Sequence, residues 1–484
     1  MTLKISAAKL SEDSLDTLVV LVKGKEILGE WKKIDTGLEK AVAHQAALDN
    51  FKGKSGQAMV FYPGKPAKRI VAIGTNGKPE WGDEFLRRAA GEAYSRAKSL
   101  GAAQFSLLLP DGRKETGQAG AEGIRLASYT FEKYKSPKED KVGGPSSATL
   151  QSPDPDETRQ GIDRGLLGAE ATCVARDLVN EHAGYMTPIR LADAAKKSCK
   201  GVKVTIRDEK WIEKMGMNAL RAVSLGSEEP PRFVHIEYKA PGAKKSVAIV
   251  GKGITFDSGG LCIKPPDGMM EMKSDMAGAA AVVGVMSVIA RVKPKVSVHG
   301  IFGATENMPG GGAYKMRDVI RAMNGKTMEI TNTDAEGRVI LSDALSYAST
   351  LKPDAIVDMA TLTGACIVAL GPKYSGIFGT DQGLVDGLLR ASKEAGERVW
   401  QLPLEEEYFE DFLKSEVADM KNSGGRWGGA IQGALFLKQF VDPKIPWAHI
   451  DIAGPAMRGT EKYYGPAGAS GVIVRTLLRY LESL

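Results

Sequence analysis

The sequence has few cysteines and histidines, and this limits the kinds of site it can form. Its 484 residues include four cysteines and five histidines. The cysteines lie far apart without a CxxC pair, so we expect neither a zinc ribbon nor a disulfide framework, and a reducing compartment fits best. The histidines show no HExxH or other short ligand spacing. His299 and His449 lie in strand-like patterns, where we expect them to be packed.

Long hydrophobic runs are also missing. The longest uncharged stretch, Met276–Ala290, is rich in Ala and Gly and shorter than the roughly 20 apolar residues that cross a bilayer. We therefore expect a buried helix there and no membrane partner. Met1–Leu10 lacks the apolar core of a secretory signal, which favours a cytoplasmic location.

Charge is present but not concentrated. The net charge is +6, with 26% charged and 43% hydrophobic residues, as in ordinary soluble proteins. Lysines and glutamates are dispersed over the chain rather than gathered in a basic block. These values argue only weakly for an acidic partner.

The length predicts at least two domains, because single cores stop growing at about 250 to 300 residues. In the first part, apolar runs alternate with helical patterns, which favours an α/β layer fold. We expect strands over Leu15–Val22, Ala58–Tyr62, Arg69–Gly74 and Phe105–Leu109, and helices over Glu84–Ser99 and Gly120–Lys133. The stretch Ser136–Asp156, rich in Ser, Pro, Gly and Lys, breaks this pattern. We therefore place an N-terminal domain at 1–150 and a C-terminal domain at 151–484.

The second part begins with a long predicted helix, roughly Asp156–Val179, and has stronger strand signals. Strands are expected over Ser246–Val250, Val296–Phe302, Ala355–Met359 and Ala448–Ile452, and helices over Ala277–Val292, Met316–Met323, Arg338–Thr350 and Gly429–Phe440. This alternation predicts a mostly parallel central sheet with helices on both faces. In such sheets ligands bind beyond the carboxyl ends of the strands.

Two motifs bring acids and lysines to that edge. The first, Val250-Gly-Lys-Gly-Ile-Thr-Phe-Asp-Ser-Gly-Gly260, follows a strand and is succeeded by Lys264 and Asp275. The second, Asn332-Thr-Asp-Ala-Glu-Gly-Arg338, precedes a helix, and in extended backbone Asp334 and Glu336 point the same way. Four carboxylates at one rim would repel one another unless cations lay between them, so the sequence predicts two divalent metal ions.

A purely structural interpretation explains each residue taken alone. An Asp before a helix is usually an N-cap, and a Gly-rich turn is usually only a turn. Caps do not account for Lys252 and Lys264 among the aspartates, nor for two acids and an arginine within five residues. The combination therefore favours a metal site.

From these two motifs, the sequence resembles the leucyl aminopeptidases of peptidase family M17 over about Asp177–Arg475. Shorter similarities are Arg176–Glu181, Gly226–Pro231, Ala360–Gly364 and Ala448–Gly454. The resemblance implies a metallo-exopeptidase that hydrolyses the N-terminal peptide bond. The N-terminal part resembles the smaller, macro-like α/β domain of that family, without a specific motif.

The resemblance also implies the role of each site residue. Asp257 and Glu336 would bridge two metals, with Asp334 completing one site and Lys252 and Asp275 the other. The ions would be Mn²⁺ or Zn²⁺, with Co²⁺ or Mg²⁺ possible in one site, and a hydroxide would bridge them. Lys264 would stabilise the oxyanion, and Arg338 would hold a bicarbonate ion that serves as general base, since all four acids are ligands.

Further implications concern substrates and partners. Leu, Met and similar first residues would enter a largely apolar pocket, and activity would favour mildly alkaline pH because the terminal amine must be neutral to bind a metal. The pocket residues would be Met272, Thr361, Gly364, Ala453 and Ala456. Core packing is the alternative for Met272.

The family assembles as a hexamer of two stacked trimers, and some members bind DNA. The chain has no recognised DNA-binding motif or basic stripe, so DNA is a weaker candidate partner than a peptide. A catalytically dead scaffold is disfavoured because every expected ligand is present.

Overall fold

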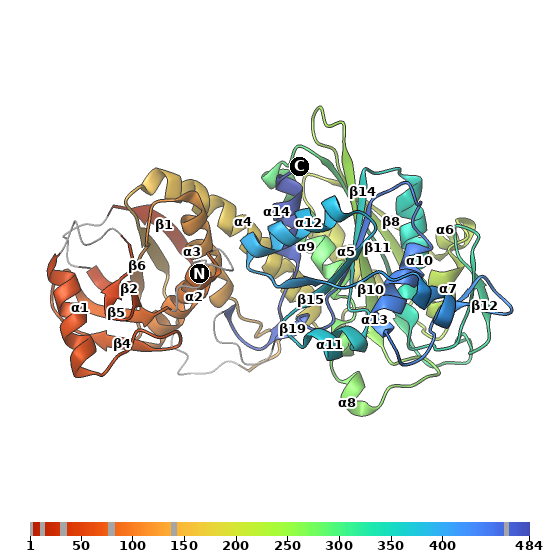
Figure 1. Cartoon of the computed structure of the whole chain (residues 1–484), viewed down its shortest axis with the longest axis horizontal. Helices are drawn as coiled ribbons and strands as arrows, with labels where there is room; N and C mark the ends of the chain where they lie inside the picture. The colour runs from red at the N-terminus through yellow and green to blue at the C-terminus, as the bar shows by residue number, and fades with distance from the viewer. Residues whose placement is uncertain (1–2, 10–14, 30–35, 76–82, 137–142, 459–463) are drawn as a thin grey trace. The chain divides into compact units, whose positions relative to one another are not determined.

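The computed structural model describes residues 3–9, 15–29, 36–75, 83–136, 143–458 and 464–484. The chain divides into two compact units, Met1–Ala169 with Gly459–Ala467 and Glu170–Arg458 with Gly468–Leu484 (Figure 1). The division falls within helix α4 (Pro155–Asn180). Compact units and domains need not end at the same residue, so the domain boundary near residue 150 stays a prediction.

The first unit is built on a seven-stranded, mostly parallel sheet. Its strand order is β1 (Lys4–Ala8), β7 (Ser147–Gln151), β6 (Gln104–Leu108), β2 (Leu15–Lys23), β5 (Ala67–Gly74) and β4 (Ala58–Phe61), with β3 (Glu26–Ile27) paired to β2. β3 and β4 pair antiparallel to their neighbours. Alternate residues of β2 enter two separate cores, because successive strand side chains point to opposite faces. Val19 and Leu21 pack with helices α2 (Glu84–Ser99) and α3 (Lys114–Ala127), whereas Leu18 and Val20 pack with α1 (Thr36–Leu48).

Helix α3 differs from the expectation that a helix spans Gly120–Lys133, since it begins at Lys114 and ends at Ala127. The first turns of this helix were not predicted because they contain glycine, which is a poor helix former. Here the glycines allow close packing: a Cβ on Gly123 would lie 2.0 Å from the carbonyl oxygen of Arg87. The stretch Ser136–Asp156 is also more than a linker, because it contains strand β7; its residues 137–142 lie outside the described residues.

The second unit is built on an eight-stranded mixed sheet. Its order is β16 (Val399–Gln401), β15 (Ser375–Gly379), β18 (Trp447–Asp451), β14 (Ala355–Ala360), β10 (Ser246–Asp257), β11 (Ser297–Asn307), β9 (Arg232–Tyr238) and β8 (Lys203–Arg207). The four central strands β18, β14, β10 and β11 are parallel. Their carboxyl ends therefore meet at one edge, as the sequence predicts.

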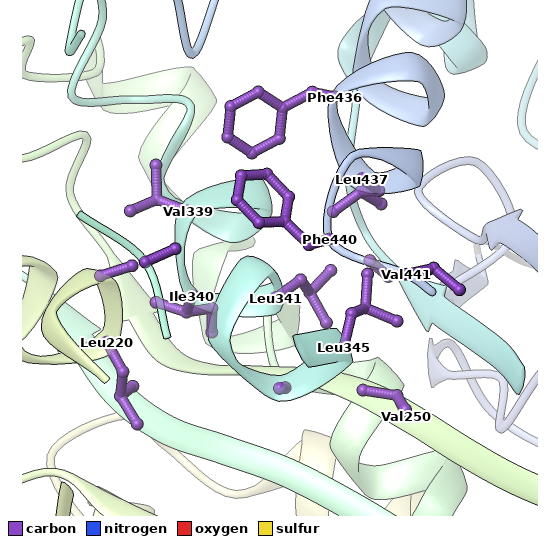
Figure 2. Packing of buried hydrophobic residues seen from close by; sticks show 14 of the residues in the cluster. Leu220, Val250, Val339, Ile340, Leu341, Leu345, Phe436, Leu437, Phe440 and Val441 are labelled. Carbon is purple, nitrogen blue, oxygen red and sulfur yellow. The ribbon is translucent and has the colours of Figure 1, made fainter. Parts of the chain in front are cut away.

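Helices cover the central strands on both faces. Besides α4, the helices of this unit are α5 (Pro188–Ser198), α6 (Glu209–Lys214), α7 (Asn218–Ser224), α8 (Pro266–Met269), α9 (Ala277–Val292), α10 (Glu336–Thr350), α11 (Gly364–Leu370), α12 (Gln382–Ala395), α13 (Gly429–Lys438) and α14 (Val474–Glu482). Figure 2 shows the core on one face, where Leu341 and Leu345 of α10 pack near Phe436 and Phe440, with Val250 of β10 below them. This packing fixes the start of α10 beside the end of β10.

Helix α9 covers the other face of β10 and spans the residues that the sequence predicts. Among the described residues, one helical stretch, Pro266–Val292, is long and apolar enough to cross a membrane, and α9 belongs to it. However, 83% of its apolar 18-residue segment is buried inside the protein. The helix lies close to the strand, because a Cβ on Gly278 would lie 2.7 Å from the backbone nitrogen of Lys252. It is a core helix.

The helix predicted over Met316–Met323 is wrong. This segment contains strand β12 (Val319–Arg321), which pairs with β13 (Thr327–Glu329), and β13 pairs in turn with β17 (Met420–Lys421). Apolar residues at 316, 319, 320 and 323 mimic a helical period. Arg317 instead has a φ of 74°, and Asn324-Gly325 forms the turn of a hairpin.

Candidate metal centre

The first motif places Lys252 inside β10 and Asp257 at the carboxyl end of that strand. Asp257 ends the strand beside Asn307, the last residue of β11. The chain then turns through Gly259 and Gly260, whose φ angles are 89° and 64°, and a Cβ on Gly259 would lie 2.3 Å from the carbonyl oxygen of Cys262. This glycine turn returns Lys264 to the strand end, where its backbone nitrogen donates to the carbonyl oxygen of Ser258 at 2.9 Å.

The second motif meets the first from the N-terminus of α10. Asn332 accepts a hydrogen bond from the backbone nitrogen of Asp334 at 2.9 Å, which fixes the turn before the helix. Glu336 is the first residue of α10. Gly337 gives room for the neighbouring lysine, because a Cβ there would lie 2.5 Å from Cε of Lys252.

The predicted acids and lysines form one cluster with alternating charges. Carboxylate oxygens of Asp257, Asp334 and Glu336 lie within 4.8 Å of one another. Nζ of Lys252 is 2.7 Å from Oδ2 of Asp275 and 2.8 Å from Oε1 of Glu336. Nζ of Lys264 is 2.9 Å from Oδ2 of Asp257 and 2.6 Å from Oδ1 of Asp334. All six residues are thus brought together.

Burial makes this cluster electrostatically costly. It raises the pKa of Asp257 and of Asp334, and raises that of Asp275 well above its ordinary value. Burial also opposes the charge of Lys252, but the surrounding carboxylates outweigh it and raise the pKa of this lysine. Oε2 of Glu336 is buried with no hydrogen-bond partner among the described residues. A buried carboxylate oxygen without a partner fits a cation ligand.

Arg338 lies buried in the first turn of α10. Its Nη1 donates to the carbonyl oxygen of Asn422 at 2.8 Å, and within the described ranges no carboxylate forms an ion pair with it. Burial lowers the pKa of Arg338 to about 10, against the opposing effect of Glu336 and Asp451. A buried guanidinium without an ionic partner is suited to hold a small anion.

The residues predicted to line the pocket differ in how directly they contact the charged cluster. Oγ1 of Thr361 donates to Oδ1 of Asp275 at 2.8 Å, and its carbonyl oxygen accepts from Nζ of Lys252 at 3.0 Å, so Thr361 contacts the cluster. Met272 begins the short 3-10 helix that Asp275 caps, and it is half-buried. A Cβ on Gly364 would meet open space. Ala453 is half-buried and Ala456 is 4% exposed. The pocket role of these residues stays a prediction.

Two residues that the sequence analysis did not predict help to hold the cluster and its neighbouring loop in place. Nδ2 of Asn307 donates to Oδ1 of Asp257 at 2.8 Å. Asp451, at the end of β18, accepts from Oγ1 of Thr363 at 2.7 Å and so fixes the loop that carries Thr361. Both lie at carboxyl ends of central strands, so the strand-end rule could have found them.

A second group of possible metal ligands lies on β9 and β11. His235, Glu237 and His299 have ligand atoms within 4.8 Å of one another. Burial lowers the pKa of His235 to about 4 and lowers that of His299. The sequence analysis did not predict this group, because the two histidines are 64 residues apart. His449 is fully buried, as expected, and its Nδ1 lies 2.6 Å from Oδ1 of Asp358.

Comparisons with known proteins show the family of the chain. Residues 173–478 match the catalytic domain of the cytosol aminopeptidase family, and residues 18–138 match its N-terminal domain. The chain is 46% identical to a probable cytosol aminopeptidase of Aquifex aeolicus (strain VF5), over 93% of this chain and 92% of that one. It is 44% identical to one from Sulfurihydrogenibium sp. (strain YO3AOP1), over 99% and 98%.

Solved structures give the same result. A mutant of tomato leucine aminopeptidase has a TM-score of 0.90 and 34% identity, covering 100% of this chain and 97% of that one. The bottromycin maturation enzyme BotP in complex with Mn has a TM-score of 0.85 and 35% identity, covering 97% and 99%. The chain therefore belongs to the cytosol aminopeptidase family, peptidase family M17, and is a metallo-aminopeptidase.

Proposed function

We propose that this aminopeptidase uses two divalent metal ions held by Lys252, Asp257, Asp275, Asp334 and Glu336. The observation that carries the proposal is the buried carboxylate cluster with its unpartnered Oε2 of Glu336. Most buried carboxylate oxygens in a cluster that serves only packing have a hydrogen-bond partner. Cations at this position would remove the repulsion among the acids.

Glu336 and Asp257 are proposed as the bridging ligands. Glu336 belongs to both parts of the cluster: it lies near Asp257 and Asp334, and its Oε1 is 2.8 Å from Nζ of Lys252. Asp334 would then complete one site, and Lys252 and Asp275 would complete the other. Lys252 must lose its proton to bind, which neighbouring dications favour.

The donor set restricts which ions fit. Carboxylate oxygens suit Mn²⁺ or Mg²⁺, while the amine nitrogen of Lys252 also admits Zn²⁺ or Co²⁺. The manganese complex of BotP supports Mn²⁺ here. Bound ions would supply Lewis-acid polarisation of the scissile carbonyl and a water of lowered pKa.

Lys264 and Arg338 are proposed to act on the reacting groups. The side chain of Lys264 is 15% exposed, against 3% for Lys252, so Lys264 lies at the rim where substrate arrives. Its ammonium group would donate to the oxyanion that forms at the carbonyl. Arg338 would hold bicarbonate as the general base, because the acids are occupied as ligands.

The substrates are proposed to be peptides with a small or medium apolar first residue, Leu and Met above all. Met272, Thr361, Gly364, Ala453 and Ala456 would line the pocket for this residue. The amino end must be neutral to bind a metal, and the pKa of a terminal amine is about 7.7 to 8.0. Activity should therefore rise from neutral to mildly alkaline pH.

We also propose a cytoplasmic homohexamer built from two trimers. The support is membership in the family, together with the dispersed charge and the absence of a CxxC pair. Light scattering would test it, since the particle should have six times the chain mass of 51.7 kDa.

Metal removal tests the proposed function directly. After treatment with a chelator, the protein should lose hydrolysis of leucine p-nitroanilide and regain it with Mn²⁺, Zn²⁺ or Co²⁺. Acetyl-leucine p-nitroanilide, which lacks the free amine, is the matched control and should not be cleaved. Full activity after chelation, or equal cleavage of both substrates, would refute the proposal.

A further inference from the structure

The His235–Glu237–His299 group has the strand geometry of a built site. In the antiparallel pair β9–β11, His299 lies opposite Glu237, and His235 lies opposite Ile301, two residues further along β11. Residues two apart on a strand share a face, and so do directly opposed residues. All three side chains therefore project from the same face of the sheet.

The donor atoms also face one another. Nε2 of His235 lies 3.0 Å from Nδ1 of His299, and Nδ1 of His235 lies 3.1 Å from Oη of Tyr347. When Nδ1 of His235 donates to Tyr347, Nε2 carries the lone pair that faces His299. Two imidazole nitrogens on one tetrahedral zinc ion are about 3.3 Å apart, since each Zn–N bond is about 2.0 to 2.1 Å long. The observed spacing is close to that value.

The surroundings support these orientations. Tyr347 packs edge-on against His235 and against Phe233, with ring centroids 5.6 Å and 4.9 Å apart. Phe233 in turn stacks on Trp211. This aromatic wall holds the His235 ring in place, and a hydrogen bond to the outer ring nitrogen is the usual support for a ligating histidine. Glu237 and His299 are half-buried, which leaves a path from solvent.

A lysine competes for the carboxylate of this group. Nζ of Lys203 lies 2.7 Å from Oε2 of Glu237. The lysine side chain is 73% exposed, so it can move into water. Ion pairs with such an exposed partner contribute little, and a divalent ion would displace this one.

We propose that His235, Glu237 and His299 bind one divalent transition-metal ion of the zinc, cobalt, nickel or copper class. Imidazole nitrogens select these ions, whereas the carboxylate cluster suits manganese or magnesium. The two places are separate, because His299 precedes Asn307 by eight residues along β11, about 26 Å at about 3.3 Å per residue. An ion here joins β9 to β11 and strengthens that side of the sheet, without contact with the substrate.

Zinc stoichiometry tests the proposal. The full-length wild type, His299→Gln, Glu237→Gln and the control His44→Gln, whose histidine is exposed on α1, are loaded with Zn²⁺, desalted and analysed for zinc per chain. Wild type and His44→Gln should hold one more zinc than the other two variants. In Co²⁺-loaded protein the same two variants should lack the visible absorption of a tetrahedral cobalt site. Peptidase activity should be equal in all four proteins.

Removal of the competing lysine gives a second readout. Lys203→Met should raise zinc affinity at this site by about two- to fivefold, because the exposed ion pair that competes for Glu237 is weak. If His299→Gln loses stability, Glu237→Gln decides the question, since its side chain keeps its shape. Equal zinc content and equal cobalt spectra in wild type and Glu237→Gln would overturn the proposal.

Discussion

At the scale of single residues, the two lysines of the metal centre have different environments. Lys252 is 3% exposed and lies between Asp275 and Glu336. Lys264 is 15% exposed and lies between Asp257 and Asp334. An enclosed amine can serve as a ligand, whereas an ammonium group at the rim can reach a substrate. Replacement of the two lysines should therefore change different properties of the enzyme.

Lys264→Ala should lower kcat by about 10²- to 10³-fold with little loss of bound metal, because it removes an oxyanion donor. Lys252→Ala should lower metal occupancy itself, because it removes a ligand. Metal analysis beside steady-state kinetics on leucine p-nitroanilide separates these outcomes. Equal loss of metal in both variants would contradict the assignment.

The planar guanidinium of Arg338 gives a second prediction at this scale. Arg338→Lys keeps the positive charge but loses the two-pronged geometry that suits an oxyanion. We expect kcat to fall by about 10²-fold, the lower range for loss of a general base. In carbon dioxide-free buffer, added bicarbonate should stimulate the wild type and leave Arg338→Lys unchanged. Equal stimulation of both proteins would speak against an anion at Arg338.

At the scale of elements, the contact between α9 and β10 positions the metal centre. Gly251 and Gly278 let the helix lie directly on the strand, and Lys252 follows in that strand. A Cβ on Gly278 would lie 2.2 Å from the carbonyl oxygen of Met359 in β14. This oxygen and the backbone nitrogen of Lys252, at 2.7 Å, are both main-chain atoms. No side chain can therefore move aside to make room for a Cβ.

Gly278→Ala should therefore push α9 away from β10 and shift Lys252. We expect a loss of about 1 to 3 kcal/mol in the free energy of unfolding, together with weaker metal binding. Gly311→Ala is the matched control, because a Cβ there meets open space and the backbone is not left-handed. Urea unfolding and metal titration of both variants provide the check; a Gly278→Ala protein as stable as the control would show that the contact is not tight.

At the scale of the whole molecule, sequence patterns correctly predicted the features that depend on a single segment or on the general geometry of parallel sheets. Helix α9 has the bounds expected from its apolar run, and the metal-centre acids converge because parallel strands end at one edge. Residues 316–323 misled the prediction, because a helical spacing of apolar residues coincides with a hairpin strand there. The contact between His235 and His299 depends on the register of β9 and β11, which a single sequence does not reveal.

The sheet of the second unit thus carries two groups of side chains that we propose to bind metal ions. The carboxylate cluster lies at the carboxyl ends of β10 and β11, and the histidine group lies nearer the other end of β11. Their donor atoms differ, so metal content and activity should vary independently. Measurements of bound metal therefore need to distinguish manganese from zinc.

Glu336 tests the central claim most directly, since it is the residue shared by both proposed metal positions. Wild type and Glu336→Gln, which keeps the volume and removes the charge, are loaded with Mn²⁺ and analysed for bound manganese and for hydrolysis of leucine p-nitroanilide. We predict that Glu336→Gln loses both manganese ions and falls to background activity. A variant that keeps its manganese and its activity would contradict the account.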